Sequence, residues 1–229
     1  MTENNCNCEA CDYRMLVFES LNSLEINSLC NFKQEKTYKK GDIIVSEGDK
    51  IDEFFYIKTG LVKTYHTLYD GREKIVNIAT PMDYISLLSV FSETYHKYSI
   101  SALDDTTVCC VNLHKIKEII KSNGEFALSL LERISKNADK IILQNLQLNS
   151  KHLRGRIAYI IILFADKIYN KESFVLPLSR KEIAQLIDMT TENVIRIISE
   201  FKKDKIIASV NKSIKVLDRK KLEQIAKHG

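Results

Sequence analysis

Short apolar runs separated by glycines fill residues 37–113 of the chain. The segments "KKGDIIVSEGD" and "DEFFYIKTGLVKTYHTLYDGREKIVNIAT" show this pattern, and "YSISALDDTTVCCVNL" continues it. The turns fall at Gly41, Gly48, Gly60 and Gly71. Asp70-Gly71 is typical of a two-residue hairpin loop, because a type I′ turn needs positive φ at both central residues. Many short strands at such close spacing predict a β-sandwich or a β-barrel.

The pattern changes to a helical period over residues 115–150, which contain one glycine and no proline. Within this segment, positions spaced by 3, 4, 3, 4 and 3 residues form a seam that is typical of a coiled coil. The seam consists of Leu131, Ile134, Ala138, Ile141, Asn145 and Leu148. A single Asn in such a seam often fixes the register and the dimeric state. We expect the seam to face a second copy while Ile142, Leu143 and Leu146 rest on the strand-rich domain; the alternative is a helix packed on its own domain.

The C-terminal part of the chain has the pattern of a small helical domain with two short strands. "RGRIAYIIILFADKIY" predicts a buried helix, and "LSRKEIAQLIDM" places Ser179 three residues before Glu182, the spacing of a capping box. "TTENVIRIISEFKKDKI" predicts a second helix with Thr190 as its N-cap. "IIASVN" and "SIKVL" predict two strands joined through Asn211-Lys212. Helix, turn, helix and hairpin in this order indicate a winged helix-turn-helix.

The helix that begins at Thr191 has two distinct faces. With an advance of about 100° per residue, one face is apolar and the other is mainly polar. The apolar face consists of Val194, Ile197, Ile198 and Phe201. The other face consists of Thr191, Glu192, Ile195, Arg196, Ser199, Lys202 and Lys203. An ordinary amphipathic surface helix would show the same division.

The second face of this helix carries side chains that suit the major groove of DNA. The Arg196 guanidinium matches two acceptors of guanine, and the Glu192 carboxylate can accept from the amino group of cytosine. Ile195 suits a thymine methyl group. Lys202 and, on the hairpin, Lys212 suit phosphates. These residues predict a helix that reads double-stranded DNA.

Charge is distributed unevenly along the chain. Residues 151–229 hold 17 Lys and Arg against 9 Asp and Glu, a balance of +8, whereas residues 1–150 hold 17 against 21, a balance of −4. A basic C-terminal part favours a polyanionic partner, although a solvated basic surface gives the same count. No apolar run approaches the roughly 18 residues that span a bilayer, and the opening "MTENNCNCEACD" is unlike a secretory signal. We therefore expect a cytoplasmic protein with no membrane partner.

The sequence shows no pattern that is typical of catalysis, so we expect no enzymatic activity. The five histidines, His66, His96, His114, His152 and His228, lie in no metal-binding or triad spacing. A phosphate-binding loop and a Gly-x-Ser-x-Gly segment are both missing from the sequence.

Three cysteines, Cys6, Cys8 and Cys11, lie within six residues of one another in a polar segment. In a cytoplasmic protein such a cluster more often binds metal or takes part in catalysis than forms disulfides. Further along the chain, Cys109 and Cys110 are adjacent in a predicted strand and therefore face opposite sides of it. The free Cys30 lies in an apolar, helix-like segment, where burial is the usual case.

The chain resembles the Crp/Fnr family of transcription regulators from about Phe18 to its last residue. "KKGDIIVSEGD", "FYIKTGLVKTY" and "DGREKIV" match the effector β-roll of that family, and "LSRKEIAQLIDMTTENVIRIISEFKKDKII" matches its helix-turn-helix. The resemblance implies an α+β fold with an N-terminal cyclic-nucleotide-binding-like β-roll (a jelly roll), a long dimerisation helix and a C-terminal winged helix-turn-helix. It divides the chain into a cysteine-bearing tail (1–17), the β-roll (18–114), the dimerisation helix (115–150) and the DNA-binding domain (151–229).

The resemblance also implies partners and DNA-binding residues. The expected partners are a second copy of the chain, a two-fold symmetric DNA operator and RNA polymerase. Glu192 and Arg196 match the positions that read the G·C pair and its neighbour in a TGA-type half-site. Thr191 and Ile195 differ from the residues that the family's branches place there, so the outer bases stay undefined. The predicted DNA-binding set is Ser179, Arg180, Thr191, Glu192, Ile195, Arg196, Lys202 and Lys212.

The branches of the family differ in what they sense. The cyclic-AMP branch binds its ligand through a Gly-Glu pair and an Arg-Ser pair, where this chain has Ser86-Leu87 and His96-Lys97. A phosphodiester needs an arginine fork or an amide nest, so a cyclic nucleotide is not expected. The oxygen-sensing branch resembles this chain better and holds a [4Fe–4S] cluster on three N-terminal cysteines and one β-roll cysteine.

Carried over to this chain, the cluster ligands are Cys6, Cys8, Cys11 and Cys109. The chain departs from that branch in spacing, with Cys-x-Cys-x2-Cys in place of Cys-x2-Cys-x5-Cys. Three alternatives therefore stay open. In the first, the tail and a fourth cysteine bind zinc, which accepts four thiolates. In the second, the tail thiols act as a redox switch. In the third, a ligand such as haem binds the β-roll without the tail.

Overall fold

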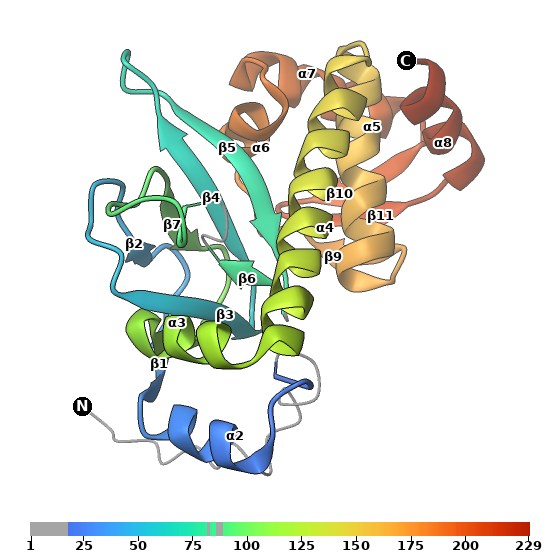
Figure 1. Cartoon of the computed structure of the whole chain (residues 1–229). Coiled ribbons are helices and arrows are strands. Elements are labelled where there is room, and N and C mark those ends of the chain that lie inside the picture. Colours follow the sequence, from blue (N-terminus) through green and yellow to red (C-terminus); the bar gives the residue numbers. More distant parts are fainter. Residues whose placement is uncertain (1–17, 82, 86–88) are drawn as a thin grey trace. The chain divides into compact units, whose positions relative to one another are not determined.

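The computed structural model of the chain describes residues 18–81, 83–85 and 89–229 (Figure 1). These residues form two compact units. The first unit is Met1–Thr67 with Val76–Lys140, and the second is Leu68–Ile75 with Ile141–Gly229. The tail cysteines Cys6, Cys8 and Cys11 lie outside the described residues, as do Ser86 and Leu87.

Two four-stranded sheets form most of the first unit, and only the first three residues of β5 are counted with the second unit (Figure 1). One sheet has the order β1-β8-β3-β6, with β1 (Lys33–Tyr38), β8 (Thr106–Asn112), β3 (Glu53–Thr59) and β6 (Tyr84–Ile85). The other has the order β2-β7-β4-β5, with β2 (Ile43–Val45), β7 (Ser99–Ala102), β4 (Val62–Thr67) and β5 (Glu73–Ala79). Phe55 and Ile57 of the first sheet pack with Val62 and Ile100 of the second. The predicted β-sandwich is therefore confirmed.

The hairpin between β4 and β5 differs from the two-residue loop predicted at Asp70-Gly71. The Leu68 N–H donates to the Arg72 carbonyl at 2.8 Å, which leaves three residues in the loop. Gly71 has φ +79°, whereas Asp70 is not among the residues with positive φ. A type I′ turn needs positive φ at both central residues. A three-residue loop needs only one left-handed residue, and Gly71 supplies it.

Three helices complete the first unit: α2 (Ser23–Cys30), α3 (Leu113–Ser122) and the first part of α4 (Gly124–Asn149). They pack with β3 and β8 in one buried cluster that includes Leu29, Tyr56 and Ile116. The single helix expected over 115–150 is divided into α3 and α4. The division falls at Asn123, which is extended and whose side-chain oxygen accepts from the Phe126 N–H at 2.9 Å. Asn123 thus caps the beginning of α4.

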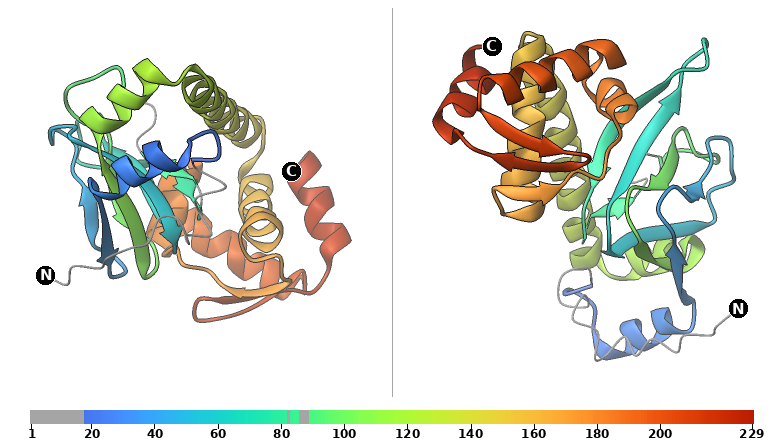
Figure 2. Two further views of the ribbon diagram at one scale, coloured as in Figure 1. Left: turned by 60° about the horizontal axis from the view of Figure 1, so that its bottom comes forward. Right: turned by 180° about the vertical axis from the view of Figure 1, so that it is seen from behind.

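The second unit contains the predicted helix-turn-helix and hairpin (Figure 2). Its elements are α5 (Leu153–Leu163), the π-helix η1 (Phe164–Tyr169), β9 (Ser173–Val175), α6 (Arg180–Ile187), α7 (Thr191–Lys203), β10 (Ile207–Val210), β11 (Ser213–Val216) and α8 (Arg219–His228). The strands form one sheet in the order β10-β11-β9. α5 packs against both α7 and α8. The pattern predicts α5, α6, α7 and the hairpin, and the third strand β9 is an addition to it.

None of the helices in the described residues combines the length and the apolar character that crossing a bilayer requires.

Candidate nucleic-acid interface and cysteine site

Side-chain caps fix the beginning of both helices in the helix-turn-helix. The Ser179 hydroxyl accepts from the Glu182 N–H at 3.1 Å, and the Glu182 carboxylate accepts from the Ser179 N–H at 2.8 Å. The Thr190 hydroxyl accepts from the Asn193 N–H at 3.3 Å. Both caps were predicted from the sequence and are confirmed. They satisfy N–H groups that the first helical turn leaves without a partner, so α6 and α7 begin at defined residues.

α7 has one buried and one accessible face, as its helical period predicts. The buried face consists of Val194, Ile197, Ile198 and Phe201, which are at most 4% exposed. On the other face Thr191 is half-buried, and the exposed residues are Glu192, Ile195, Arg196, Ser199, Lys202 and Lys203. Ile195 is 50% exposed, although it is apolar. The structure therefore brings Thr191, Glu192, Ile195 and Arg196 together on one open helix face.

Two acceptors hold the Arg196 side chain along α7. Its Nη1 donates to Glu200 Oε1 at 2.5 Å, and its Nη2 donates to Asn193 Oδ1 at 3.2 Å. The second Glu200 oxygen accepts from Arg154, at the beginning of α5. The Arg196 side chain is still 56% exposed. Its guanidinium is therefore oriented and accessible at the same time.

The other predicted residues take different places in this unit. Ser179 is engaged as the N-cap of α6. Arg180 is half-buried, and burial lowers the pKa of its guanidinium. Lys202 lies in the last turn of α7, and Lys212 lies in the β10–β11 turn, where Asn211 has φ +53°. The two lysines are exposed and accessible to a polyanion. Ser179 and Arg180, at the start of α6, are only half-exposed.

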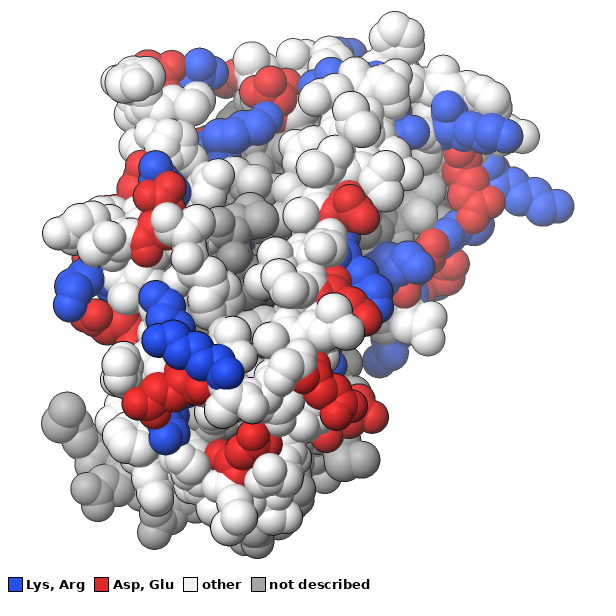
Figure 3. Space-filling model, in the orientation of Figure 1, with Lys and Arg blue, Asp and Glu red and all other residues white. Residues whose placement is uncertain are grey.

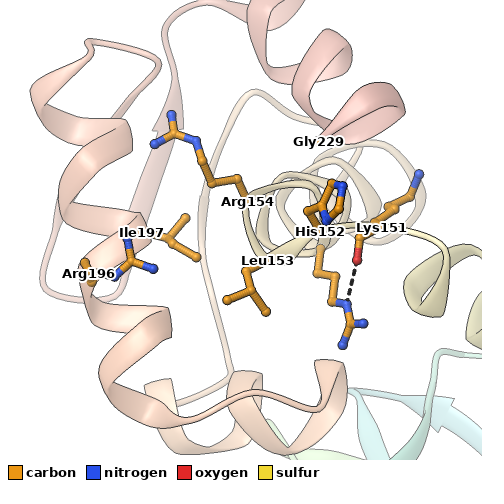
Figure 4. Close-up of a pocket in the computed structure, with 8 residues that line it drawn as sticks. Lys151, His152, Leu153, Arg154, Arg196, Ile197 and Gly229 are labelled. Carbon is orange, nitrogen blue, oxygen red and sulfur yellow. Dashed lines mark hydrogen bonds between the residues drawn. The ribbon is translucent and has the colours of Figure 1, made fainter.

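A cavity of about 540 Å³ opens beside the first turn of α5 and the middle of α7. Figure 4 shows Arg196 and Ile197 of α7 on one side and Arg154 with its neighbours on the other. The lining consists of Lys151, His152, Leu153, Arg154, Arg156, Arg196, Ile197 and Gly229. Sequence reasoning missed Arg154 and Arg156, although "LRGR" at a helix start is a visible basic signal.

Arg156 has a structural role in this cavity. It donates to the Lys151 carbonyl at 3.0 Å, the dashed line in Figure 4. It also donates to the Ile187 carbonyl at 2.9 Å. Because Ile187 is the last residue of α6, Arg156 joins the beginning of α5 to the end of α6.

Basic side chains are not gathered into one patch on the face of the molecule seen in Figure 3. There, Lys and Arg lie among Asp and Glu. Ion pairs account for part of this mixture in the second unit, where Arg219 donates to Asp166 at 2.6 Å and to Glu223 at 2.6 Å. These acidic partners are already counted in the +8 balance of residues 151–229, so the excess positive charge is spread over other side chains of this segment. The geometry of α7, more than the net charge, defines the candidate interface.

Cys109 is fully buried on the helix-covered side of β8. It lies opposite Glu35 of β1 and Tyr56 of β3 in the sheet register. Its thiol donates to Glu35 Oε1 at 3.7 Å. Burial raises the pKa of the Cys109 thiol to about 11, an effect that the nearby Lys33 opposes. The thiol form is therefore strongly favoured at neutral pH in this arrangement.

Cys110 faces the other side of β8, as strand alternation predicts. It packs between the two sheets, whereas Cys109 packs under the helices. Burial raises the pKa of the Cys110 thiol to about 12. Cys30 packs partly buried against the same cluster as Cys109. The prediction that adjacent Cys109 and Cys110 point in opposite directions is confirmed.

The described chain begins close to Cys109. Phe18 packs edge-on against Tyr56, with ring centroids 5.8 Å apart, and Tyr56 is the cross-strand neighbour of Cys109. Cys11 precedes Phe18 by seven residues, which span at most about 24 Å. The described residues contain no group of three His, Cys, Asp or Glu that could hold a metal ion. Cys109 thus lies in the buried cluster that Phe18 also joins, and its thiol is inaccessible in this arrangement.

The predicted seam of α4 becomes less exposed along the helix. Leu131 is 59% exposed, but Ile134 packs against the core of the first unit and Leu148 is only 7% exposed. The Asn145 amide donates to the Ile141 carbonyl of its own helix at 2.8 Å. A strict seven-residue repeat drifts by about 20° per heptad around a straight helix, so the exposure of its members changes gradually along α4.

The exposed apolar side of α4 contains residues that the sequence analysis placed against the strand-rich domain. Ile142, Leu143 and Leu146 are 56%, 57% and 60% exposed. Leu128 and Leu131 are 59% exposed on the same helix. We name these five residues the α4 apolar stripe.

Family models match both parts of the chain. The cyclic nucleotide-binding domain matches residues 35–123, and the Crp-like helix-turn-helix domain matches residues 155–225. The chain belongs to the Crp/Fnr family. It is a transcriptional regulator of the Crp/Fnr type that uses its helix-turn-helix for DNA, and its relatives are regulators, not enzymes.

Curated relatives of the Crp/Fnr family match nearly the whole chain. The transcriptional activator protein Anr of Pseudomonas protegens is 25% identical over 221 residues, which cover 94% of this chain and 90% of that protein. The transcriptional activator protein FnrL of Cereibacter sphaeroides is 28% identical over 210 residues, which cover 88% and 84%.

Solved structures show the same fold. FixK2 from Bradyrhizobium japonicum has a TM-score of 0.75 and 24% identity, and the match covers 84% of this chain and 96% of that one. A Crp/Fnr-family regulator from Eubacterium rectale has a TM-score of 0.76 and 20% identity, and it covers 92% and 97%. Together with the family models, these neighbours confirm the predicted α+β Crp/Fnr fold.

Within this fold, a buried histidine lies near the position of the Arg-Ser pair of the cyclic-AMP branch. His96 stands near the position of the Arg-Ser pair and is 5% exposed. Burial lowers the pKa of its imidazole, although the Asp49 carboxylate acts in the opposite direction. The adjacent Lys97 pairs with Glu93 at 3.2 Å. A buried, neutral imidazole does not replace an arginine fork for a phosphodiester.

Proposed function

We propose that this Crp/Fnr regulator binds a two-fold symmetric operator as a homodimer and that an iron–sulfur cluster on Cys6, Cys8, Cys11 and Cys109 switches its DNA affinity. The proposed signal is oxygen, nitric oxide or cellular redox state. RNA polymerase is the proposed partner at the promoter, and the cytoplasm is the proposed compartment. The open face of α7, with Glu192, Ile195 and Arg196 on it, is the single observation that carries the DNA-reading part.

The dimer proposal is supported by the α4 apolar stripe. Leu128, Leu131, Ile142, Leu143 and Leu146 each leave more than half of the side chain in water. A second copy that covers this stripe would remove apolar surface from water on both protomers, at about 25 cal/mol for each Å². Two copies of α7 would then face successive major grooves of one operator.

The cluster proposal is supported by the place where the described chain begins. Phe18 and Leu21 belong to the same buried cluster as Cys109, so the tail starts beside that thiol. A bound cluster would supply iron–thiolate bonds between the tail and β8, and their loss on oxidation would free the tail. To act as a ligand, Cys109 must give up its bond to Glu35 and lose its proton.

One observation favours a second candidate function. Cys109 is 0% exposed, and its thiol pKa of about 11 disfavours the thiolate that a metal ligand requires. In this alternative the tail cysteines bind zinc or form a thiol redox switch without Cys109. The same regulator would then respond to a β-roll ligand such as haem or another small molecule.

The deciding experiment is an absorption spectrum of the full-length protein purified without air, with iron, sulfide and zinc assayed on the same sample. The cluster predicts broad absorbance near about 400 nm that bleaches in air, with about four iron and four sulfide per chain. Cys109→Ala is expected to abolish both the cluster and its effect on operator affinity. Zinc without iron would reject the cluster and favour the alternative, whereas an unchanged cluster in Cys109→Ala would remove Cys109 from the ligand set.

A further inference from the structure

Glu200 joins two arginines that belong to different helices of the second unit. One carboxylate oxygen accepts from Arg154 at the beginning of α5, and the other accepts from Arg196 in the middle of α7. Arg196 is four residues from Glu200 on the same helix, whereas Arg154 is 46 residues away along the chain. The contact with Arg154 therefore depends on the packing of α5 against α7.

Arg154 is fixed by further contacts around its guanidinium. Its Nη2 donates to Asp204 Oδ2 at 3.2 Å, and the guanidinium carbon lies 5.0 Å from the centroid of the Phe201 ring. Phe201 is fully buried. An arginine that lies over a buried ring and contacts two carboxylates has little rotamer freedom. Arg154 therefore anchors Glu200 from outside α7.

The anchored carboxylate orients Arg196. Glu200 and Asn193 are the two acceptors that the described residues offer, and they engage two of the five N–H donors of the guanidinium. Guanine needs only two donors for its O6 and N7 atoms. Arg154 and Arg196 together balance Glu200 and Asp204, so Arg196 is oriented within a group of four charges that sums to zero. This arrangement preorganises a guanidinium for a base edge.

We propose that Glu200, held by Arg154, is a positioning residue that determines how strictly Arg196 discriminates its base. The proposal rests on the proposed function, in which Arg196 reads a base. Without the carboxylate, Arg196 keeps its charge but its guanidinium is free to rotate. The sequence-independent affinity for DNA then persists. The affinity ratio between the selected and the substituted base pair falls only at the position that Arg196 reads.

The test uses the full-length protein and duplexes that the wild type selects from random-sequence DNA. Arg196→Ala identifies the base pair that Arg196 reads, as the pair whose substitution no longer weakens binding. We expect Glu200→Gln to lower the affinity ratio between the selected and the substituted base pair by about fivefold or more. The ratios at all other base pairs are expected to stay unchanged.

Asp204→Asn is the matched control for charge. It removes the same unit charge from the same end of α7, but Asp204 contacts Arg154 and not Arg196. It is expected to change the affinity for all duplexes alike. Arg154→Lys keeps the positive charge but loses the forked donor, so it is expected to lower the same ratio as Glu200→Gln. Because the ion pairs are partly exposed, the variants are expected to unfold near the wild-type temperature.

Three results would overturn the proposal while leaving the proposed function in place. Glu200→Gln could keep the wild-type ratio, it could bind the operator more tightly at an unchanged ratio, or Asp204→Asn could lower the ratio equally. A wild type that selects no sequence, or an Arg196→Ala variant that keeps every ratio, would instead reject the base-reading role of Arg196.

Discussion

Glu35 and Cys109 lie directly opposite each other in the β1–β8 pair, and the thiol donates a hydrogen bond to the carboxylate at 3.7 Å. The same carboxylate accepts from Lys58 at 2.9 Å and lies 3.8 Å from the Lys33 ammonium. The Glu35 and Lys33 side chains are only 10% and 4% exposed. One carboxylate therefore contacts two lysines, of which Lys33 is almost inaccessible to water.

Loss of this carboxylate is expected to be costly. Glu35→Ala leaves Lys33 and Lys58 without their shared counter-ion, which we expect to lower the free energy of unfolding by roughly 3 kcal/mol. Glu53→Ala is the matched control, because its pair with Lys36 is about one-third exposed on both sides. We expect it to cost less than about 1 kcal/mol. Urea unfolding of both variants measures the difference, and equal losses would contradict the buried network.

The buried His96 is expected to make stability dependent on pH. Burial lowers its folded-state pKa below the ordinary value of 6.5. Below pH 6.5 the unfolded chain therefore binds more protons than the folded chain, and the stability contribution of the neutral imidazole is lost as the pH falls. His96→Gln is expected to lose stability less steeply between pH 7 and pH 5 than the wild type. Urea unfolding at several pH values checks this, and identical slopes would show that the pKa of His96 is the same in the folded and unfolded states.

Local features of the DNA-binding unit could be predicted from the sequence. The caps Ser179 and Thr190 and the two faces of α7 depend on residues within about four positions, and all three predictions are confirmed. The contacts that orient Arg196 and Cys109, by contrast, join residues that are far apart in the sequence. Arg154 and Glu200 are 46 residues apart, and Glu35 and Cys109 are 74 residues apart. Such pairs follow from helix packing and strand register, which no local pattern specifies.

The rotation of α4 could not be predicted for a related reason. A spacing of 3 and 4 residues is compatible with both a 3.5-residue and a 3.6-residue period, and the two diverge along a helix of 26 residues. Ile134 packs against the buried cluster that α2 and α3 share, and this contact fixes which side of α4 faces the first unit. The apolar stripe therefore lies to one side of the predicted seam.

Gly60 is expected to be the least replaceable glycine of the β-sandwich. It has φ +90°, and an added Cβ would overlap Thr106 Oγ1 and lie 2.5 Å from the Asp105 carbonyl oxygen. Gly41 has φ +93°, but an added Cβ there meets nothing within 4 Å. Gly41→Ala is expected to cost about 1–2 kcal/mol from backbone strain alone. Gly60→Ala adds a clash worth roughly 1–3 kcal/mol. Denaturant unfolding compares them, and equal costs would contradict the close approach.

The α4 apolar stripe is expected to hold the dimer together. Leu146→Glu places a charge in the proposed interface, and the lost burial is worth about 1.5–3 kcal/mol for each leucine. The dimer dissociation constant is therefore expected to rise at least about tenfold. Sedimentation equilibrium measures it. Leu24→Glu is the control, because Leu24 is 82% exposed on α2, outside the stripe. Equal effects of both variants, or none of Leu146→Glu, would reject the stripe as the interface.

Lys212 and Arg196 are expected to affect DNA binding in different ways. Lys212 lies in the exposed β10–β11 turn and is proposed to contact a phosphate, so Lys212→Ala should weaken binding to all sequences alike. In a dimer with two such contacts, the slope of log affinity against log salt concentration should fall by about 2. Arg196→Ala should instead weaken the selected operator most, because it removes a base contact. Titrations of both variants at several salt concentrations separate the two effects. A sequence-dependent loss in Lys212→Ala would assign the turn to base reading and not to phosphate contact.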